Sequence, residues 1–549
     1  MSSVQATNRI TGARRWWVLV AVLITMFFSS MDQTVVSTAM PTIIGDLRGL
    51  NLYAWVFTAY MMASSVTVPI YGKMSDVYGR KPFYLFGLIA FMVGSAVSGL
   101  SHSMMALILS RAGQGIGAGA MMSMPRATIG DIFNPRERGR WMGIIGGVFG
   151  LASIIGPALG GWITDNFGWR WVFYINLPIA LIALVLVWIF LPTVRTEHKA
   201  VPDLLGSLIL VAGLLAVLLG FTWAGSKYPW GSWQILTLFI VGGLVLAAFA
   251  IYESRIENPV LSPVLFKNPI FTSSMVVGLM VSMGLFGSLM FLPLFVQGVI
   301  GLSASGSGVV LTPMMLSFIV GSIVGGQLIS RTGRYKLQAH VSAGIMILGM
   351  YLLTRMNAST GYGTVVINMI VLGLGVGTLM PLLNVAVQNA FPYQILGMVN
   401  STQQFVSSLG GVIASPILGS LMTGTFTREL PRQLSPGLKA LIAKLPTAIR
   451  VQLLNPQALA TASAQRALAA KFTHIPGGQL LYRNFLHAFK VALSMGIVDL
   501  FKLGLAFSAV ALIGTFFLRE VKLKKDEFFQ TKAQDSHEET PPKTSSRPD

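Results

Sequence analysis

The amino-acid sequence predicts an all-α integral membrane protein with fourteen transmembrane helices, and three observations carry this prediction. The 549 residues are 53% hydrophobic and only 11% charged, a composition far from that of a soluble domain. Roughly fourteen apolar runs are long enough to cross a bilayer, which needs about 20 residues per helix. Motifs in the first half of the chain recur in the second half, as in transporters that are built from repeats.

Three pairs of similar segments, about 255–260 residues apart, divide the chain into two six-span halves with two spans left over. The paired segments are 72–80 with 326–334, 113–117 with 373–377, and 152–161 with 411–420. We expect a cytoplasmic N-terminus over 1–15, an N-terminal six-helix bundle over 16–200 and two linker helices over 201–267. The first five helices of a C-terminal bundle are expected over 268–423. A long extracellular loop over 424–490, a last helix over 491–519 and a disordered cytoplasmic tail over 520–549 complete the chain.

The net charge of +20 reflects the topology of the chain. Most basic residues lie in short connections between apolar runs, where the positive-inside rule places the cytoplasmic side. Nucleic-acid binding would need basic residues on one exposed face, so we expect no nucleic-acid partner. The distribution predicts a multi-pass protein of the plasma membrane, in contact with its lipid, with both termini in the cytoplasm.

The segment 424–490 departs from this charge distribution. It is polar and basic and contains Pro431, Pro436, Pro446 and Pro456, yet the topology places it outside. The positive-inside rule is weak for long loops, so we keep the topology. Stretches 436–445 and 456–471 have amphipathic helical spacing, which favours packed surface helices over a cap on the outer mouth.

The connection Gly72–Lys81 resembles the signature loop of the major facilitator superfamily. Further similarities are Arg111–Gly115 in span 4 and Gly156–Gly161 at the end of span 5. Segments 31–41 and 169–178 are similar to those of its fourteen-span drug:proton antiporter branch. The resemblance covers about residues 12–423 and the last span. It implies two halves that rock around a site near the membrane midplane.

Two charged residues lie deep in the predicted membrane, where ionisable groups are costly and are functional candidates. Asp32 lies about 24 Å from the inner face and Arg111 about 10 Å below the outer face, at 1.5 Å per helical residue. We hypothesise that Asp32 takes up the proton and binds the cationic part of substrates, and that Arg111 balances its charge. The alternative is a permanent ion pair that holds spans 1 and 4 together. In the resembled family, both positions are implicated in proton or cation handling.

The cytoplasmic ends of spans 2 and 4 hold a second candidate charge cluster. We expect Asp76 to cap a helix N-terminus of the opposite half and Arg80 to bridge to Asp131. In relatives such a network, with Gly72 and Gly79 in the turn, is a latch that stabilises the outward-open state. The alternative is a surface salt bridge worth about 0–1 kcal/mol.

Uncharged groups form two further candidate sets. The glycine and proline run of span 5 matches the antiporter helix-packing motif of the resembled family, although Ala152 stands where the family usually has glycine; its residues are Gly156, Pro157, Gly160 and Gly161. Polar side chains of spans 4, 12 and 13 either line the cavity or pair across helices; these are Gln114, Asn384, Asn400, Gln403 and Gln404.

Three other charged residues have simpler interpretations. Asp165 and Asp499 are predicted near the outer face, where solvated surface roles are favoured over coupling. Arg126 lies deeper in the inner half of span 4, and its side chain is expected to extend to the inner interface.

The sequence also excludes several classes of chemistry. There is no cysteine, so no disulfide, thiol catalysis or cysteine metal site exists. No phosphate-binding glycine loop followed by Lys-Ser or Lys-Thr appears, so ATP does not drive the protein by that route. The six histidines form no metal-ligand spacing. We expect no enzyme activity and no cofactor, with the proton gradient as the energy source.

These observations predict proton-coupled export of lipophilic or cationic drugs and toxic amphiphiles by alternating access, by a protein expected to be a monomer. One alternative is a dedicated exporter of a single natural product or lipid. Another, from a different class, is a membrane accessory protein that acts through its extracellular loop.

Overall fold

The computed structural model describes most of the chain. The described residues are 13–47, 53–133, 135–192, 203–225, 227–256, 259, 261–302, 304–392, 395–443, 465, 468–469 and 478–521. Most of the predicted tail, the N-terminal residues 1–12 and most of the stretch 456–471 lie outside them.

The described residues form long helices that account for all fourteen predicted spans. Twelve helical segments are apolar and long enough to cross a membrane, and α3 and α5, with 26 and 29 residues, supply spans 2 and 4. The fold class is therefore confirmed. The N-terminal helices are α2 (Ala13–Leu47), α3 (Tyr53–Tyr78), α4 (Arg80–Gly99), α5 (Met104–Ile132), α6 (Pro135–Phe167), α7 (Trp171–Tyr174) and α8 (Asn176–Phe190). The remaining spans are α9 (Leu204–Trp223), α10 (Trp233–Glu253), α11 (Pro269–Phe295), α12 (Ala304–Thr332), α13 (Lys336–Thr354), α14 (Tyr362–Asn389), α15 (Leu396–Gln433) and α19 (Gly478–Phe516).

Three of the described helices begin at a side chain that caps the first turn. The side chain of Ser103 accepts a hydrogen bond from the backbone N–H of Ala106 at the start of α5. Asp203 caps α9 through Gly206, and Asn268 caps α11 through Ile270. These side chains satisfy backbone donors that have no partner within the first turn.

The two halves repeat one packing arrangement. α5 packs against α3 and α4, and α14 packs against α12 and α13. Small residues permit this close approach: a Cβ at Gly117 would collide with the backbone of α4, and one at Gly375 with the backbone of α13. Gly79 and Gly333 both have positive φ, 87° and 67°, so the repeated connection depends on the conformational freedom of glycine in each half.

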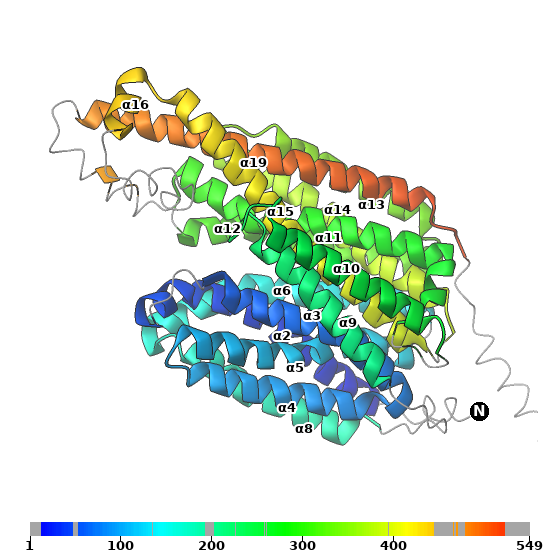
Figure 1. Ribbon diagram of the computed structural model, residues 1–549. Helices are drawn as coiled ribbons and strands as arrows, with labels where there is room; N and C mark the ends of the chain where they lie inside the picture. The colour runs from blue at the N-terminus through cyan, green and yellow to red at the C-terminus, as the bar shows by residue number, and fades with distance from the viewer. Residues whose placement is uncertain are drawn as a thin grey trace, which may run out of the picture.

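The linker helices α9 and α10 pack against each other and, through α9, against both halves. Leu210 and Leu214 of α9 share a hydrophobic cluster with Met62 of α3 and Phe405 of α15. The linker hairpin therefore lies along the seam where α3 meets α15 (Figure 1).

α15 and α19 are much longer than the spans expected from the sequence. α15 continues to Gln433 and α19 begins at Gly478, so both ends of the segment 424–490 are helical. Phe426 and Phe489 pack edge to face with ring centroids 5.3 Å apart. The short helix α16 (Pro436–Ala443) follows and falls within the predicted surface helix. Figure 1 shows these elements projecting together at one end of the molecule.

The halves contact each other along α6 and α12, on the inner side of the molecule. A Cβ at Gly139 would lie 2.9 Å from the carbonyl oxygen of Gly326, and one at Gly143 would lie 2.6 Å from that of Ser322. These backbones leave no room for larger side chains, so the two halves pack tightly where α6 begins and α12 ends.

Candidate functional site

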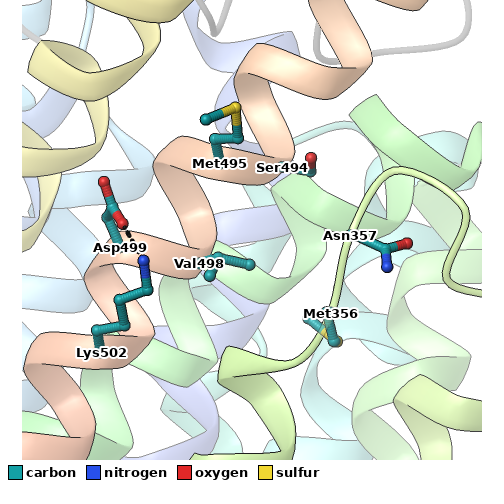
Figure 2. A pocket seen from close by; sticks show the side chains of 7 residues that line it. All are labelled: Met356, Asn357, Ser494, Met495, Val498, Asp499 and Lys502. Atoms are coloured by element: carbon teal, nitrogen blue, oxygen red, sulfur yellow. Dashed lines mark hydrogen bonds and ion pairs between the residues drawn. The ribbon is translucent and has the colours of Figure 1, made fainter.

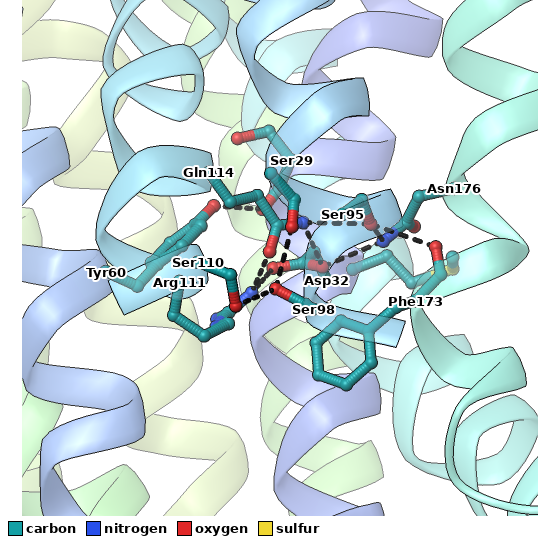
Figure 3. A network of polar contacts seen from close by, with 12 residues as sticks. Ser29, Asp32, Tyr60, Ser95, Ser98, Ser110, Arg111, Gln114, Phe173 and Asn176 are labelled. Carbon is teal, nitrogen blue, oxygen red and sulfur yellow. Dashed lines mark hydrogen bonds and ion pairs between the residues drawn. The ribbon is translucent and has the colours of Figure 1, made fainter. Parts of the chain in front are cut away.

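Asp32 lies at the centre of a buried polar network (Figure 3). Its side chain is inaccessible to solvent, as is that of Arg111. Oδ2 accepts a hydrogen bond from Nη1 of Arg111 at 2.6 Å. Oδ1 accepts from Nε2 of Gln114 at 3.0 Å and from Nδ2 of Asn176 at 2.9 Å. α2, α5 and α8 thus converge on one carboxylate.

Arg111 is only partly satisfied by hydrogen bonds. Nη1 donates to Asp32 and to Oε1 of Gln114, the latter at 2.6 Å, whereas Nε and Nη2 are buried with no partner among the described residues. The guanidinium stacks on Tyr60 of α3, 4.1 Å from its ring centroid, a favourable cation–π geometry. Unmet donors at a buried ion pair cost stability.

Asn176 is a member of this network that the sequence did not single out. Its amide donates to Asp32 and, at 3.1 Å, to the hydroxyl of Ser95 on α4. The sequence feature that points to Asn176 is its position inside the segment 169–178. In the structure it begins α8 directly after the short helix α7. A polar residue at the start of an otherwise apolar helix is a candidate for an interhelical hydrogen bond.

The cytoplasmic charge cluster lies between the two halves. Oδ1 and Oδ2 of Asp76 accept hydrogen bonds from the backbone N–H groups of Gly397 and Met398, at 3.0 and 2.7 Å. These groups begin α15, so Asp76 occupies the N-terminus of a helix in the opposite half, where a negative charge is favoured. Arg80 lies between Asp76 and Asp131, at 2.5 and 2.9 Å.

Glycines allow these helices to approach. A Cβ at Gly72 would collide with Ser401, and one at Gly397 would collide with the side chains of Asp76 and Arg80. Gly79 ends the turn with a positive φ of 87°, a backbone conformation that residues other than glycine rarely adopt.

The glycine and proline motif of span 5 lies on α6. A Cβ at Gly156 would collide with Thr34 of α2, two residues after Asp32. This glycine therefore lets α6 pack closely against α2 beside the Asp32 site. The carbonyl of Gly160 accepts from Thr164, and Gly161 has open space around its Cα. The side chain of Pro157 lies outside the described residues.

The other predicted polar groups do not join the Asp32 network. Gln388 of α14 donates to Asn400 of α15 at 2.8 Å. Gln403 is buried and its Oε1 has no partner among the described residues. Gln404 donates to Ser408 and Asn384 to the carbonyl of Met380, each within its own helix. These amides lie in the C-terminal half. Gln388 was not among the polar residues that the sequence pointed to.

Arg126 and the predicted outer acids occupy different environments. Arg126 is partly buried and donates to the carbonyl of Met122 in its own helix, at 3.2 Å. Asp499 accepts from Thr425 at 3.0 Å and from Lys502 at 2.8 Å. It borders a pocket of about 120 Å³ between α19 and the end of α13 (Figure 2). The side chain of Asp165 lies outside the described residues.

A further ion pair joins the end of α2 to the α6–α7 connection. Trp169 donates to Asp46 at 2.8 Å, and Arg170 contacts the same carboxylate oxygen at 3.0 Å. The indole donor, and then the guanidinium, hold the pKa of the exposed Asp46 carboxyl below its ordinary value. This contact lies beyond the apolar part of α2.

Comparison with known proteins identifies the class. Residues 22–415 match the Major Facilitator Superfamily. Multidrug transporter protein MdtP of Bacillus subtilis (strain 168) is 38% identical over 95% of this chain and 96% of its own length. Multidrug resistance protein 3 of the same organism is 38% identical over 75% of this chain and 81% of its own length.

Solved structures agree with this fold. The human organic anion transporter MFSD10 has a TM-score of 0.61 at 15% identity, covering 93% of this chain and 100% of its own. The chain therefore belongs to the Major Facilitator Superfamily, as its motifs predicted.

Proposed function

We propose that this protein exports lipophilic or cationic drugs and toxic amphiphiles in exchange for protons. The observation that carries the proposal is the buried Asp32 carboxylate, held by one cation and two amides on three helices. Proton uptake removes its charge and weakens its hold on Arg111. A cationic substrate and a proton then compete for the same carboxylate, which couples their movements.

The closed inner face supports alternating access. Asp76 holds the start of α15, and α6 packs against α12 on the same side. We propose that this network is the latch of the outward-open state and that its release exposes Asp32 to the cytoplasm. The proton gradient supplies the energy. We propose that the protein works as a monomer in the plasma membrane, with both termini in the cytoplasm.

Drug-driven proton release tests this proposal. Inside-out vesicles are acid-loaded, and ethidium is added as the lipophilic cation while luminal pH is recorded. We expect the wild type to release protons and Asp32→Asn at equal expression to release none. Asp499→Asn is the matched control, because it makes the same change at an acid that pairs with Lys502 outside the network.

Two outcomes contradict the proposal. Equal proton release by wild type and Asp32→Asn would move coupling away from Asp32. No release by the wild type with any lipophilic cation would exclude a multidrug antiporter, and would favour a dedicated exporter or an accessory role of the outer segment.

A further inference from the structure

The two amides of the Asp32 network have the same hydrogen-bonding arrangement. Nε2 of Gln114 donates to Oδ1 of Asp32 and, at 3.2 Å, to Oγ of Ser95. Nδ2 of Asn176 donates to the same two oxygens, at 2.9 and 3.1 Å. Ser95 accepts both bonds and donates to the carbonyl of Phe173 at 2.9 Å. All these polar side chains are at least 99% buried.

A permanent ion pair needs only donors around the carboxylate, and arginine can provide several. An amide differs from arginine because it carries a donor and an acceptor that exchange places when the group makes a half-turn. The two amides of this network can therefore serve a carboxyl group that alternates between accepting and donating a hydrogen bond. Gln114 is less free to turn, because its Oε1 already accepts from Arg111 at 2.6 Å.

We propose that Asn176 is a positioning residue whose amide serves both protonation states of Asp32, donating to the ionised carboxylate through Nδ2 and, after a half-turn, accepting from the protonated carboxyl through Oδ1. The proposal rests on the proposed function, in which protonation of Asp32 is the coupling event. The proton comes from water on the outer side, and one O–H bond forms at Oδ1 of Asp32, which becomes neutral.

The half-turn transmits the change to neighbouring helices. It replaces the donor that faced Ser95 with an acceptor, so the Ser95 hydroxyl turns to Asn176. The carbonyl of Phe173 then loses the hydrogen bond that ties α7 to α4. Proton binding at α2 thereby releases α7 from α4, while the hydrogen bond between α4 and α8 is kept with its direction reversed.

Few ionisable groups face Asp32 from the helices packed around it. Among the described residues these are Arg111 from α5 and Tyr60 from α3. α4 and α8 contribute the uncharged Ser95 and Asn176, and α6 approaches a neighbouring turn of α2 through Gly156. The pH response of this site therefore depends on a small set of residues that can be changed one at a time.

Infrared difference spectroscopy on the purified full chain tests the proposal, because Asp32→Asn identifies the carboxyl C=O band of Asp32. In Asn176→Leu we expect the band to shift, since the protonated carboxyl loses its acceptor. We expect the midpoint of its titration to rise by about one pH unit, because the bond lost by the charged carboxylate is stronger than the bond lost by the neutral carboxyl. Asn368→Leu is the control, since Asn368 bonds only the carbonyl of Leu352 in the C-terminal half.

A second variant keeps the shape of the side chain. In Asn176→Asp two carboxyl groups lie within hydrogen-bond distance and share one proton. We expect this variant to fold and to lose drug-driven proton release. An unchanged Asp32 band and midpoint in Asn176→Leu, or wild-type proton release by Asn176→Asp, would overturn the proposal. Absence of proton release by the wild type would contradict the proposed function instead, and the infrared titration would still report on Asn176.

Discussion

The N-terminal half buries an ion pair where the C-terminal half, built on the same plan, carries apolar side chains. The glycine run 113–117 aligns with 373–377, so Arg111 corresponds to Val371 and Gln114 to Leu374. Arg111 is fully buried against a carboxylate, whereas Val371 and Leu374 are apolar and half-buried. The comparison teaches that the repeat preserves helix packing and that only one copy carries the charge.

The inner turns differ in the same way. Asp76, which holds the start of α15, corresponds to Ser330 in the second copy, whereas Arg80 corresponds to Arg334. Arg334 is exposed, and Arg80 is bound between two carboxylates. A glycine with positive φ is present in both connections, and the first copy contacts the opposite half through the carboxylate of Asp76.

The largest expected effect comes from removing one partner of the buried pair. Arg111→Ala leaves the Asp32 carboxylate buried beside an empty space, and we expect a loss of about 3–5 kcal/mol. Thermal unfolding in detergent measures the effect, with Val371→Ala as the corresponding change in the other half. We expect the double variant Asp32→Asn/Arg111→Gln to regain stability without proton release. Equal loss in Arg111→Ala and Val371→Ala would contradict the asymmetry.

The next largest effect is expected at the inner latch. Asp76→Asn removes the charge that faces the N-terminus of α15, so the closed inner face should become less populated. Cysteine substitutions on α6 and α12 would then become accessible to a membrane-impermeant thiol reagent from the cytoplasmic side, and the chain has no native cysteine to interfere. Ser330→Asn should leave accessibility unchanged, and an equal increase in both variants would show that the carboxylate is not the relevant group.

A smaller effect is expected from the amides of the C-terminal half. Gln388→Leu removes one hydrogen bond to Asn400 but leaves the amide of Asn400 buried, and we expect a loss of about 1–3 kcal/mol. Thermal unfolding detects it, and drug-driven proton release should be retained. Loss of proton release at normal stability would show that both halves take part in coupling.

The smallest effect is expected at the outer ion pair of Asp46. Because the folded-state pKa is lowered, its contribution to stability is present above the ordinary pKa of about 4 and is lost as pH falls through the lower folded value. We expect Asp46→Asn to lose this small contribution at pH 7, where the wild-type carboxylate is ionised, and to flatten the pH dependence of unfolding below about pH 4. The same acid dependence in the variant as in the wild type would contradict this assignment.

Sequence reasoning reached the spans and the repeat but missed two structural features. Asn176 lies in a stretch of aromatic and aliphatic residues, and nothing in its neighbours shows that α8 turns its amide toward Asp32. The sequence predicts a loop over the extensions of α15 and α19, because polar and basic residues interrupt the apolar pattern there. Those residues are polar on one face only, since Phe426 and Phe489 pack in the core between the two helices.

The sequence alone determined the number of spans, the two halves and the deep placement of Asp32 and Arg111, because hydrocarbon excludes charge and enforces helices wherever the chain is apolar. Only the tertiary structure decided which groups meet. Asp32, Gln114 and Asn176 are separated by up to 144 residues, and no local preference brings their helices together. That arrangement depends on how small residues let α2, α4, α5 and α8 pack, which is a property of the folded bundle.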